Sequence, residues 1–323
     1  MIPIRDQIPS KSYPAVTHGI IGLNVLVFLY QSMQGEHLER FIYTYGLVPA
    51  RYAVPEISAH FTFVEQAFAL LSFMFLHGGV LHLLGNMWSL YIFGDNVEDR
   101  MGTTRFLAFY LLCGWASGFA HLWSNWGSTV PTIGASGAIA GVMGAYFILF
   151  PGARIITLIP IFFIPYFVEV PAVVFLGIWL LFQFFYASLP GPEGGGGIAW
   201  WAHIGGFVFG MIAVKLFSRL PESRLDEKLH ETLARHASPR LQRIHPVAET
   251  DDLNLYGNVV ITAKEARGGT RKMISVPGDA ARRAFMVTIP PDTENGTRIR
   301  LAGLGRAEGG RAGDIYLEIR VEG

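Results

Sequence analysis

The sequence predicts an all-α polytopic membrane domain followed by a small all-β sandwich domain. Of the 323 residues, 51% are hydrophobic and 15% are charged, against about 25% charged residues in an ordinary soluble domain. Residues 1–220 hold 19 charged residues and residues 221–323 hold 31, so the shortage of charge lies in the first part. We therefore expect a membrane domain over 1–220, a juxtamembrane helix or linker over 221–250 and a β-domain over 251–323.

Six apolar runs precede residue 220, and a helix of about 20 apolar residues crosses a hydrocarbon core of about 30 Å. The expected spans are residues 17–35, 77–94, 104–124, 134–150, 170–189 and 198–217. An apolar stretch broken by prolines, 155–168, lies between the fourth and the fifth. Lys and Arg in short loops favour the cytoplasmic side, and most of those flanking the spans fall on one side. We therefore expect a multi-pass protein of the plasma (inner) membrane with both termini in the cytoplasm.

The last part of the chain shows the period of two that is typical of half-buried strands. Ile315, Leu317 and Ile319 alternate with the polar or amphipathic residues between them. Similar segments lie at residues 259–262, 272–276, 285–289 and 299–301. Together these segments predict about five strands in roughly 70 residues, which indicates a small β-sandwich.

Charge and cysteine content exclude several classes of protein. The net charge of +0 and a pI near 7.2 argue against a nucleic-acid-binding protein, which would carry a basic face. A single cysteine, Cys113, excludes an internal disulfide framework and a multi-cysteine metal site. We expect neither a metal nor a cofactor. A transporter or channel would need charged residues along several spans, and the spans hold almost none.

Polar residues within membrane spans are costly and mark functional sites by default. His82 and Asn86 lie four residues apart on one helix face, Ser136 opens the fourth expected span, and His203 lies early in the sixth. Under the predicted orientation, all four lie in the outer halves of their spans and therefore at one depth. A histidine that takes a serine proton, beside donors that hold an oxyanion, is what acyl transfer requires.

Each of these residues also has a structural interpretation. A serine between glycines commonly packs or bonds back to its own helix, and a single histidine or asparagine within a span can be structural. The joint occurrence of all four, with glycines on the fourth and sixth spans that permit close helix packing, favours catalysis. We interpret His18, His77 and His121 as interfacial or structural.

Four segments resemble, in the same order, the sequence blocks of the rhomboid intramembrane serine proteases. They are HGGVLHLLGN, FGDNVEDRMG, GASGAIAGVMGAY and AHIGGFVFG, and the resemblance covers most of residues 15–220. It implies a six-helix rhomboid bundle in which Ser136 is the nucleophile and His203 its general base, without a carboxylate. It also implies an oxyanion site formed by His82, Asn86 and the backbone N–H of Ser136, and we place Gly134 in the same oxyanion and substrate-binding site.

The sequence departs from the resemblance in three places. Some rhomboids carry a tyrosine one turn after the serine that stacks on the histidine, and this chain has Ala140 there, which leaves the support of His203 unidentified. The connection 37–65 has no Trp-Arg pair. The glycine-rich segment 191–197 (GPEGGGG) stands where the family has its mobile lid.

The tail resembles one substrate-binding β-domain of the DnaJ-type co-chaperones. The resemblance is carried by YGNVVITAKEARGGTRKMISVP, VTIPPDTENGTRIRLAGLG and GDIYLEIRV, without a J-domain His-Pro-Asp or a zinc-binding insert. It implies a hydrophobic groove at 251–323 that binds an extended cytoplasmic peptide or protein by strand addition. A folded dock without a client fits the same residues equally well.

The sequence therefore predicts an intramembrane serine endopeptidase that cleaves transmembrane segments of membrane proteins near the outer face. The expected partners are these substrates and the lipid bilayer, with no nucleic acid. The alternative is a non-catalytic, rhomboid-like membrane adaptor or chaperone that binds transmembrane helices without cutting them.

Overall fold

The computed structural model describes residues 2–8, 10, 12–161, 164–189, 199–220, 225–226, 229, 241–244, 253–276, 283–308 and 311–322. The expected lid, 191–197, and most of the expected linker, 221–250, lie outside the described residues. The chain forms two compact units. One comprises Met1–Ile8 and Ser12–Leu233, and the other has its body in Ala234–Gly323.

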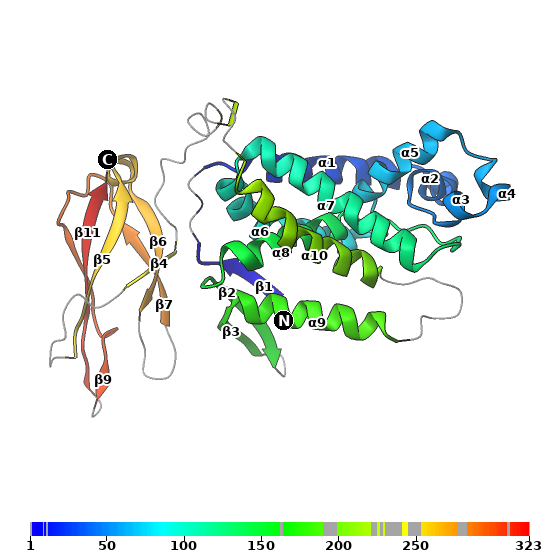
Figure 1. Cartoon of the computed structure of the whole chain (residues 1–323). Coiled ribbons are helices and arrows are strands. Elements are labelled where there is room, and N and C mark those ends of the chain that lie inside the picture. The colour runs from blue at the N-terminus through cyan, green and yellow to red at the C-terminus, as the bar shows by residue number, and fades with distance from the viewer. Residues whose placement is uncertain are drawn as a thin grey trace. The chain divides into compact units, whose positions relative to one another are not determined.

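The first unit is a bundle whose six main helices correspond to the six expected spans (Figure 1). They are α1 (Ala15–Ser32), α6 (Val80–Met101), α7 (Thr103–Ser124), α8 (Ser136–Leu149), α9 (Ala172–Ala187) and α10 (Trp200–Phe217). The predicted helical membrane bundle is thus confirmed. One boundary differs by more than three residues: α6 continues to Met101, whereas its apolar run predicts an end near residue 94.

The six helices differ in whether they are long enough to cross a membrane. Among the described residues, α1, α7 and α10 are long and apolar enough to cross a membrane, and α5–η2 with α6 is a fourth candidate, bent by 79°. Helix α8 has 14 residues and α9 has 16, which at 1.5 Å per residue gives about 21 and 24 Å. Because α8 packs against the 22-residue α7, at least one end of α8 lies between the two ends of α7.

Helix α8 is at the centre of the bundle and contacts α6, α7 and α10. All its residues from Gly137 to Tyr146 are buried. Its contact with α10 is made by backbone: a Cβ atom at Gly206 would collide with the carbonyl of Gly137, and one at Gly210 with the carbonyl of Gly141. The glycines therefore set the distance between the two helices that carry Ser136 and His203.

Short helices fold the connection between α1 and α6. They are η1 (Gly35–His37), α2 (Leu38–Tyr45), α3 (Ala50–Ala53), α4 (Pro55–Ser58), α5 (Phe63–Ser72) and η2 (Phe73–Phe75). The fully buried Arg51 holds this connection together, since its guanidinium lies 3.7 Å from the ring centroid of Phe61 and donates to the carbonyls of Tyr43 and Thr44. A single arginine thus organises a loop that lacks a Trp-Arg pair.

The helical unit also contains a three-stranded antiparallel sheet that the sequence analysis did not predict. Strands β1 (Ile2–Asp6), β2 (Arg154–Ile161) and β3 (Ile164–Pro171) pair in the order β1-β2-β3. The sequence of residues 155–168 is apolar almost throughout, so it lacks the alternation that would have indicated strands. The sheet brings the N-terminal strand beside the connection between α8 and α9.

The charged C-terminal end of α6 binds the N-terminal segment. These contacts explain why the helix continues beyond the apolar run that ends near residue 94. The carboxylate of Glu98 accepts the backbone N–H groups of Val16 and Thr17 at 3.0 and 2.8 Å, which are orphan donors of the first turn of α1. The buried carboxylate of Asp6 accepts hydrogen bonds from Asn96 Nδ2 and the Tyr146 hydroxyl, both at 2.7 Å.

The second unit is a β-sandwich, in agreement with the prediction. Its strands are β4 (Leu241–Arg243), β5 (Leu255–Thr262), β6 (Thr270–Val276), β7 (Arg283–Ile289), β8 (Arg298–Leu301), β9 (Ala307–Glu308), β10 (Arg311–Ala312) and β11 (Ile315–Glu322), with a short helix α12 (Ala263–Gly268). The two three-stranded sheets, β5-β11-β8 and β4-β6-β7, share one apolar core. Strand β4 comes from residues assigned above to the linker, and β5 pairs with β11 in parallel.

A glycine substitution tests the role of the α8–α10 contact. In Gly210→Ala the new methyl group must push α10 away from the Gly141 carbonyl, and overpacking of this kind costs about 1–3 kcal/mol. We expect a lower thermal unfolding midpoint in detergent. Gly22→Ala in α1 is the matched control, because nothing lies within 4 Å of a Cβ atom there. Equal midpoints for the two variants would contradict the proposed packing role.

The pH dependence of stability tests the Asp6 contact. Burial raises the pKa of the Asp6 carboxyl to about 6, so the folded protein binds this proton more tightly than the unfolded chain. Asp6 therefore contributes stability below about pH 4 that is lost as the pH rises through about 6, by about 2–3 kcal/mol. The stability of Asp6→Asn should lack this decline in unfolding measured between pH 4 and 7. Parallel pH profiles for the two proteins would contradict the assignment.

Candidate active site

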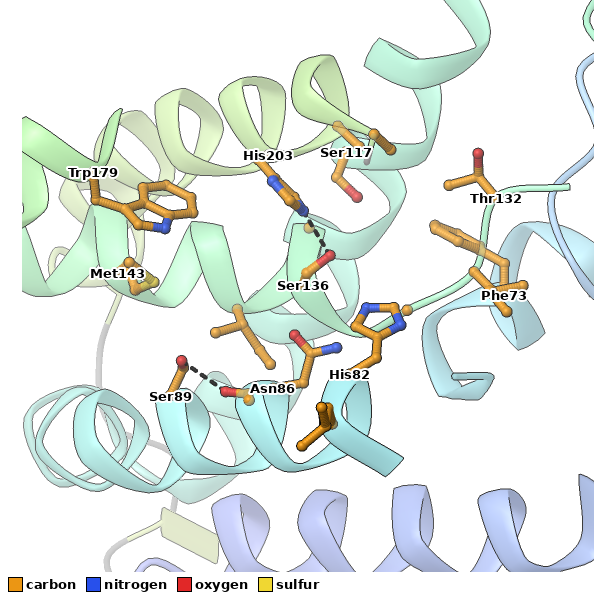
Figure 2. Close-up of a pocket in the computed structure, with 18 of the residues that line it drawn as sticks. Phe73, His82, Asn86, Ser89, Ser117, Thr132, Ser136, Met143, Trp179 and His203 are labelled. Carbon is orange, nitrogen blue, oxygen red and sulfur yellow. Dashed lines mark hydrogen bonds between the residues drawn. The ribbon is translucent and has the colours of Figure 1, made fainter. Parts of the chain in front are cut away.

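A cavity of about 630 Å³ lies within the helical unit, between α6, α8, α9, α10 and residues 131–134 (Figure 2). It is lined by all the residues that the sequence analysis assigned to the site: Ser136, His203, His82, Asn86 and Gly134. Side chains from α6 point toward Ser136 from one side, and His203 on α10 approaches it from the other. The fold thus brings together residues that are up to 121 positions apart in the chain.

Ser136 and His203 form a direct hydrogen bond. The distance from His203 Nε2 to Ser136 Oγ is 2.7 Å, within the range expected for a nucleophile and its base. Ser136 is the first residue of α8, and the backbone N–H groups of a first helical turn have no partner within the helix. The serine therefore stands where a developing negative charge meets the positive end of a helix.

The direction of each hydrogen bond assigns the tautomer of both histidines. His203 Nδ1 lies 2.8 Å from the amide oxygen of Gln183 on α9, an acceptor, so the proton of the neutral ring is on Nδ1 and Nε2 is free to accept from the Ser136 hydroxyl. His82 has the opposite arrangement. The backbone N–H of Gly78 donates to its Nδ1 at 3.2 Å, which leaves Nε2–H as a donor.

Asn86 supplies a second donor. Its Nδ2 is buried and has no hydrogen-bond partner among the described residues, and Figure 2 shows the amide directed toward the space beside Ser136. A buried donor without a partner costs about 1–3 kcal/mol, a cost that an oxygen bound in the cavity would remove. His82 Nε2–H, Asn86 Nδ2 and the backbone N–H of Ser136 are therefore the donors available to an oxyanion.

Gly134 contributes space, because its own N–H is already bonded to the carbonyl of Phe73 at 2.9 Å. Its φ of +133° lies in the region that favours glycine. A Cβ atom at this position would lie 3.0 Å from His82 Nε2 and 3.6 Å from Ser136 Oγ. A larger residue would thus crowd the Nε2 edge of His82 and the Ser136 hydroxyl.

The other histidines near the cavity have structural contacts. His121 Nε2 lies 2.6 Å from Thr132 Oγ1 and ties the segment before α8 to α7. The backbone of His77 exchanges two hydrogen bonds with the side chain of Gln31 on α1, and its ring lies 5.2 Å from that of His82 between centroids.

The structure identifies two residues around His203 that the sequence analysis missed. They are Gln183, which accepts the Nδ1 proton, and Trp179, whose ring centroid lies 5.9 Å from that of His203 at an interplanar angle of 35°. Both belong to α9, one turn apart, and a glutamine within an expected span was the signal available in the sequence. Among the described residues, no three metal-ligating side chains converge.

These contacts define a serine–histidine site inside an apolar helical bundle. Residues 64–220 match the Rhomboid domain family, and residues 245–323 match the DnaJ C terminal domain family. The chain is therefore similar to rhomboid domains over residues 64–220 and to DnaJ C-terminal domains over residues 245–323, as the sequence resemblances indicated. With its apolar helices, it is a membrane protein.

Curated relatives share the rhomboid name. Rhomboid protein 1, mitochondrial, of Saccharomyces cerevisiae is 28% identical over 230 residues, which cover 68% of this chain and 58% of the yeast protein. RHOMBOID-like protein 2 of Arabidopsis thaliana is 40% identical over 78 residues, or 24% of each chain. Presenilin-associated rhomboid-like protein A, mitochondrial, of Danio rerio is 34% identical over 90 residues, 27% of this chain and 24% of its own. The chain thus spans less than two thirds of the length of each of these relatives.

Proposed function

We propose that the chain is an intramembrane serine endopeptidase that cleaves transmembrane segments of membrane proteins. The observation that carries the proposal is the 2.7 Å hydrogen bond from Ser136 to His203. The oxyanion donors on the other side of the serine support it, since a serine that only packs its helix would need neither a base nor unpartnered donors. Membership of residues 64–220 in the Rhomboid domain family supports the same reaction class.

The geometry supports a two-step acyl transfer. His203 Nε2 takes the proton of Ser136 as Oγ attacks the carbonyl carbon of the scissile bond. The tetrahedral oxyanion accepts hydrogen bonds from Asn86, His82 and the Ser136 backbone N–H. The C–N bond then breaks as the imidazolium protonates the leaving amine. Water, deprotonated by His203, hydrolyses the acyl-enzyme and restores the Ser136 hydroxyl.

The position of Ser136 supports a substrate that enters from the membrane. Helix α8 is shorter than its neighbour α7, so a serine at its first residue can lie below the membrane surface while the cavity still admits water. Helical amides are hydrogen-bonded and inaccessible, so the substrate must unwind before it is cut. We propose cleavage near the outer face, at a segment whose helix unwinds easily.

We propose that both termini lie in the cytoplasm, because most basic residues of the short loops fall on that side of the predicted spans. On that orientation the plasma membrane is the expected residence. The yeast and zebrafish relatives have mitochondrial names, and an inner mitochondrial membrane would place the same termini in the matrix.

The β-sandwich is proposed to recruit proteins to the protease. Its match to the DnaJ C terminal domain and the edge strands that its sheets have among the described residues, β8 in one sheet and β4 and β7 in the other, suit an extended peptide that adds as a strand. Under the proposed orientation it lies on the cytoplasmic side and cannot reach the scissile bond. Its effect on cleavage would therefore come from recruiting proteins or from conformational coupling to the helical unit.

A fluorophosphonate probe tests the serine site. In detergent, the wild type should be labelled and Ser136→Ala should not, while His203→Ala should label at least a hundredfold more slowly because Oγ has lost its base. Asn86→Ala should slow labelling about 10²–10³-fold, as expected for loss of one oxyanion donor. Ser89→Ala is the matched control, since this serine lines the same cavity but bonds to the Gly85 carbonyl.

The control should label like the wild type. A folded wild type that is not labelled, or that labels at the same rate as His203→Ala, would contradict the enzyme and favour the non-catalytic adaptor, which binds transmembrane helices without cutting them.

Deletion of residues 251–323 tests the recruitment role. The fluorophosphonate labelling of Ser136 should be unchanged, because the described residues that line the cavity all belong to the helical unit. Cleavage of membrane-protein substrates in native membranes should become slower or change in range, measured by comparing cleaved fragments with and without the domain. Identical fragments and rates would indicate a folded dock without a client.

A further inference from the structure

We infer that Gln183 on α9 is a positioning residue for His203, occupying the place that a carboxylate has in a Ser-His-Asp triad. The inference deepens the proposed serine endopeptidase and rests on it. The amide oxygen of Gln183 accepts the Nδ1 proton, so that the ring presents a bare Nε2 to the nucleophile. The chain of contacts is Gln183 Oε1 to His203 Nδ1 at 2.8 Å, and His203 Nε2 to Ser136 Oγ at 2.7 Å.

The orientation of the amide is set by a second contact. Gln183 Nε2 donates to the backbone carbonyl of Trp179 at 3.1 Å, so the amide nitrogen is turned along its own helix and the oxygen faces His203. With the two amide atoms reversed, the nitrogen would face the imidazole and one carbonyl would lose its donor. Gln183 is only 5% exposed, so its oxygen is largely shielded from solvent.

The tautomer matters because a neutral imidazole carries one N–H. If the proton were on Nε2, His203 would donate toward Ser136 and could not take its proton, and Nδ1 would face the Gln183 oxygen without a hydrogen between them. The Gln183 acceptor therefore disfavours the inactive tautomer. The Gln183 oxygen also keeps its hydrogen bond to Nδ1–H when His203 becomes an imidazolium during the attack by Oγ. A purely apolar neighbour could not make this bond.

Helix α9 therefore supplies the support that Ala140 on α8 cannot. Trp179, one turn before Gln183, lies 5.9 Å from the imidazole between ring centroids at 35°, and Trp200 lies 6.2 Å from it at 87°. Two aromatic rings thus lie near the histidine, and the amide sets its tautomer. A neutral amide does this without placing a charge in a helix that has none, as the lipid surroundings of α9 require.

Two substitutions at position 183 separate positioning from packing. Gln183→Met keeps the length of the side chain and removes the acceptor, whereas Gln183→Glu keeps an acceptor oxygen. Leu181→Met is the matched control, because Leu181 is on the same helix and exposed. The readouts are the rate of fluorophosphonate labelling against pH and the ¹⁵N signals of His203 in detergent, assigned by difference from His203→Ala. Unfolding midpoints check that each variant is folded.

We expect Gln183→Met to label at least about tenfold more slowly than the wild type, the worth of one lost buried hydrogen bond, and to lose the protonated Nδ1 signal. Gln183→Glu should recover labelling. Its carboxylate stabilises the imidazolium, so the acid limb of labelling should move to higher pH, with His82 on α6 as the other titratable side chain acting on His203. Leu181→Met should match the wild type in both readouts.

Wild-type labelling and an unchanged Nδ1 signal in folded Gln183→Met would overturn the inference, as would a wild-type spectrum with the proton on Nε2. A wild type that is not labelled contradicts the proposed function instead. In that case a protonated Nδ1 signal that depends on Gln183 would still support the contact, so the two failures are distinguishable.

Discussion

The close approach of α8 and α10 is the constraint on which the rest of the site depends. In a bilayer no hydrophobic effect drives two apolar helices together, so association relies on packing at short range. Glycines at 144, 206 and 210 allow the two backbones to touch, because a Cβ atom at any of them would collide with the backbone of the other helix. Because Ser136 begins one helix and His203 lies in the first turn of the other, this backbone contact determines whether Oγ and Nε2 are within hydrogen-bonding distance.

At the site itself, the direction of the hydrogen bonds determines which nitrogen of each histidine donates and which accepts. Two neutral histidines are used in opposite senses: a backbone N–H donates to His82 Nδ1 and makes Nε2 a donor, whereas an amide oxygen accepts from His203 Nδ1 and makes Nε2 an acceptor. Neither assignment needs an ion. The proposed base and the proposed oxyanion site thus need no buried carboxylate beside them, whose desolvation would be costly.

Much of the fold could be predicted from the sequence, because each environment imposes its own pattern of apolar residues. Lipid requires long apolar runs, so the six helices were visible as runs, and a half-buried strand requires alternation, so most strands of the β-sandwich were visible as a period of two. The sheet β1-β2-β3 was missed because the sequence of residues 155–168 is apolar almost throughout and shows no period of two. The extension of α6 to Met101 was missed because its charged end is explained only by partners far away in the chain, Glu98 by the first turn of α1 and Asn96 by Asp6.

The sequence by itself determined the class of fold and the candidate residues, since Ser136, His203, His82 and Asn86 are polar groups in spans where polarity is costly. Only the tertiary structure decided what each group does. It placed Gln183 against His203, although sequence reasoning had left that histidine without support at Ala140, and it showed that Gly134 serves as space, with its N–H already bonded elsewhere. The physical reason is that a tautomer, or a free donor, is a property of the neighbours of a residue, and here those neighbours come from other helices.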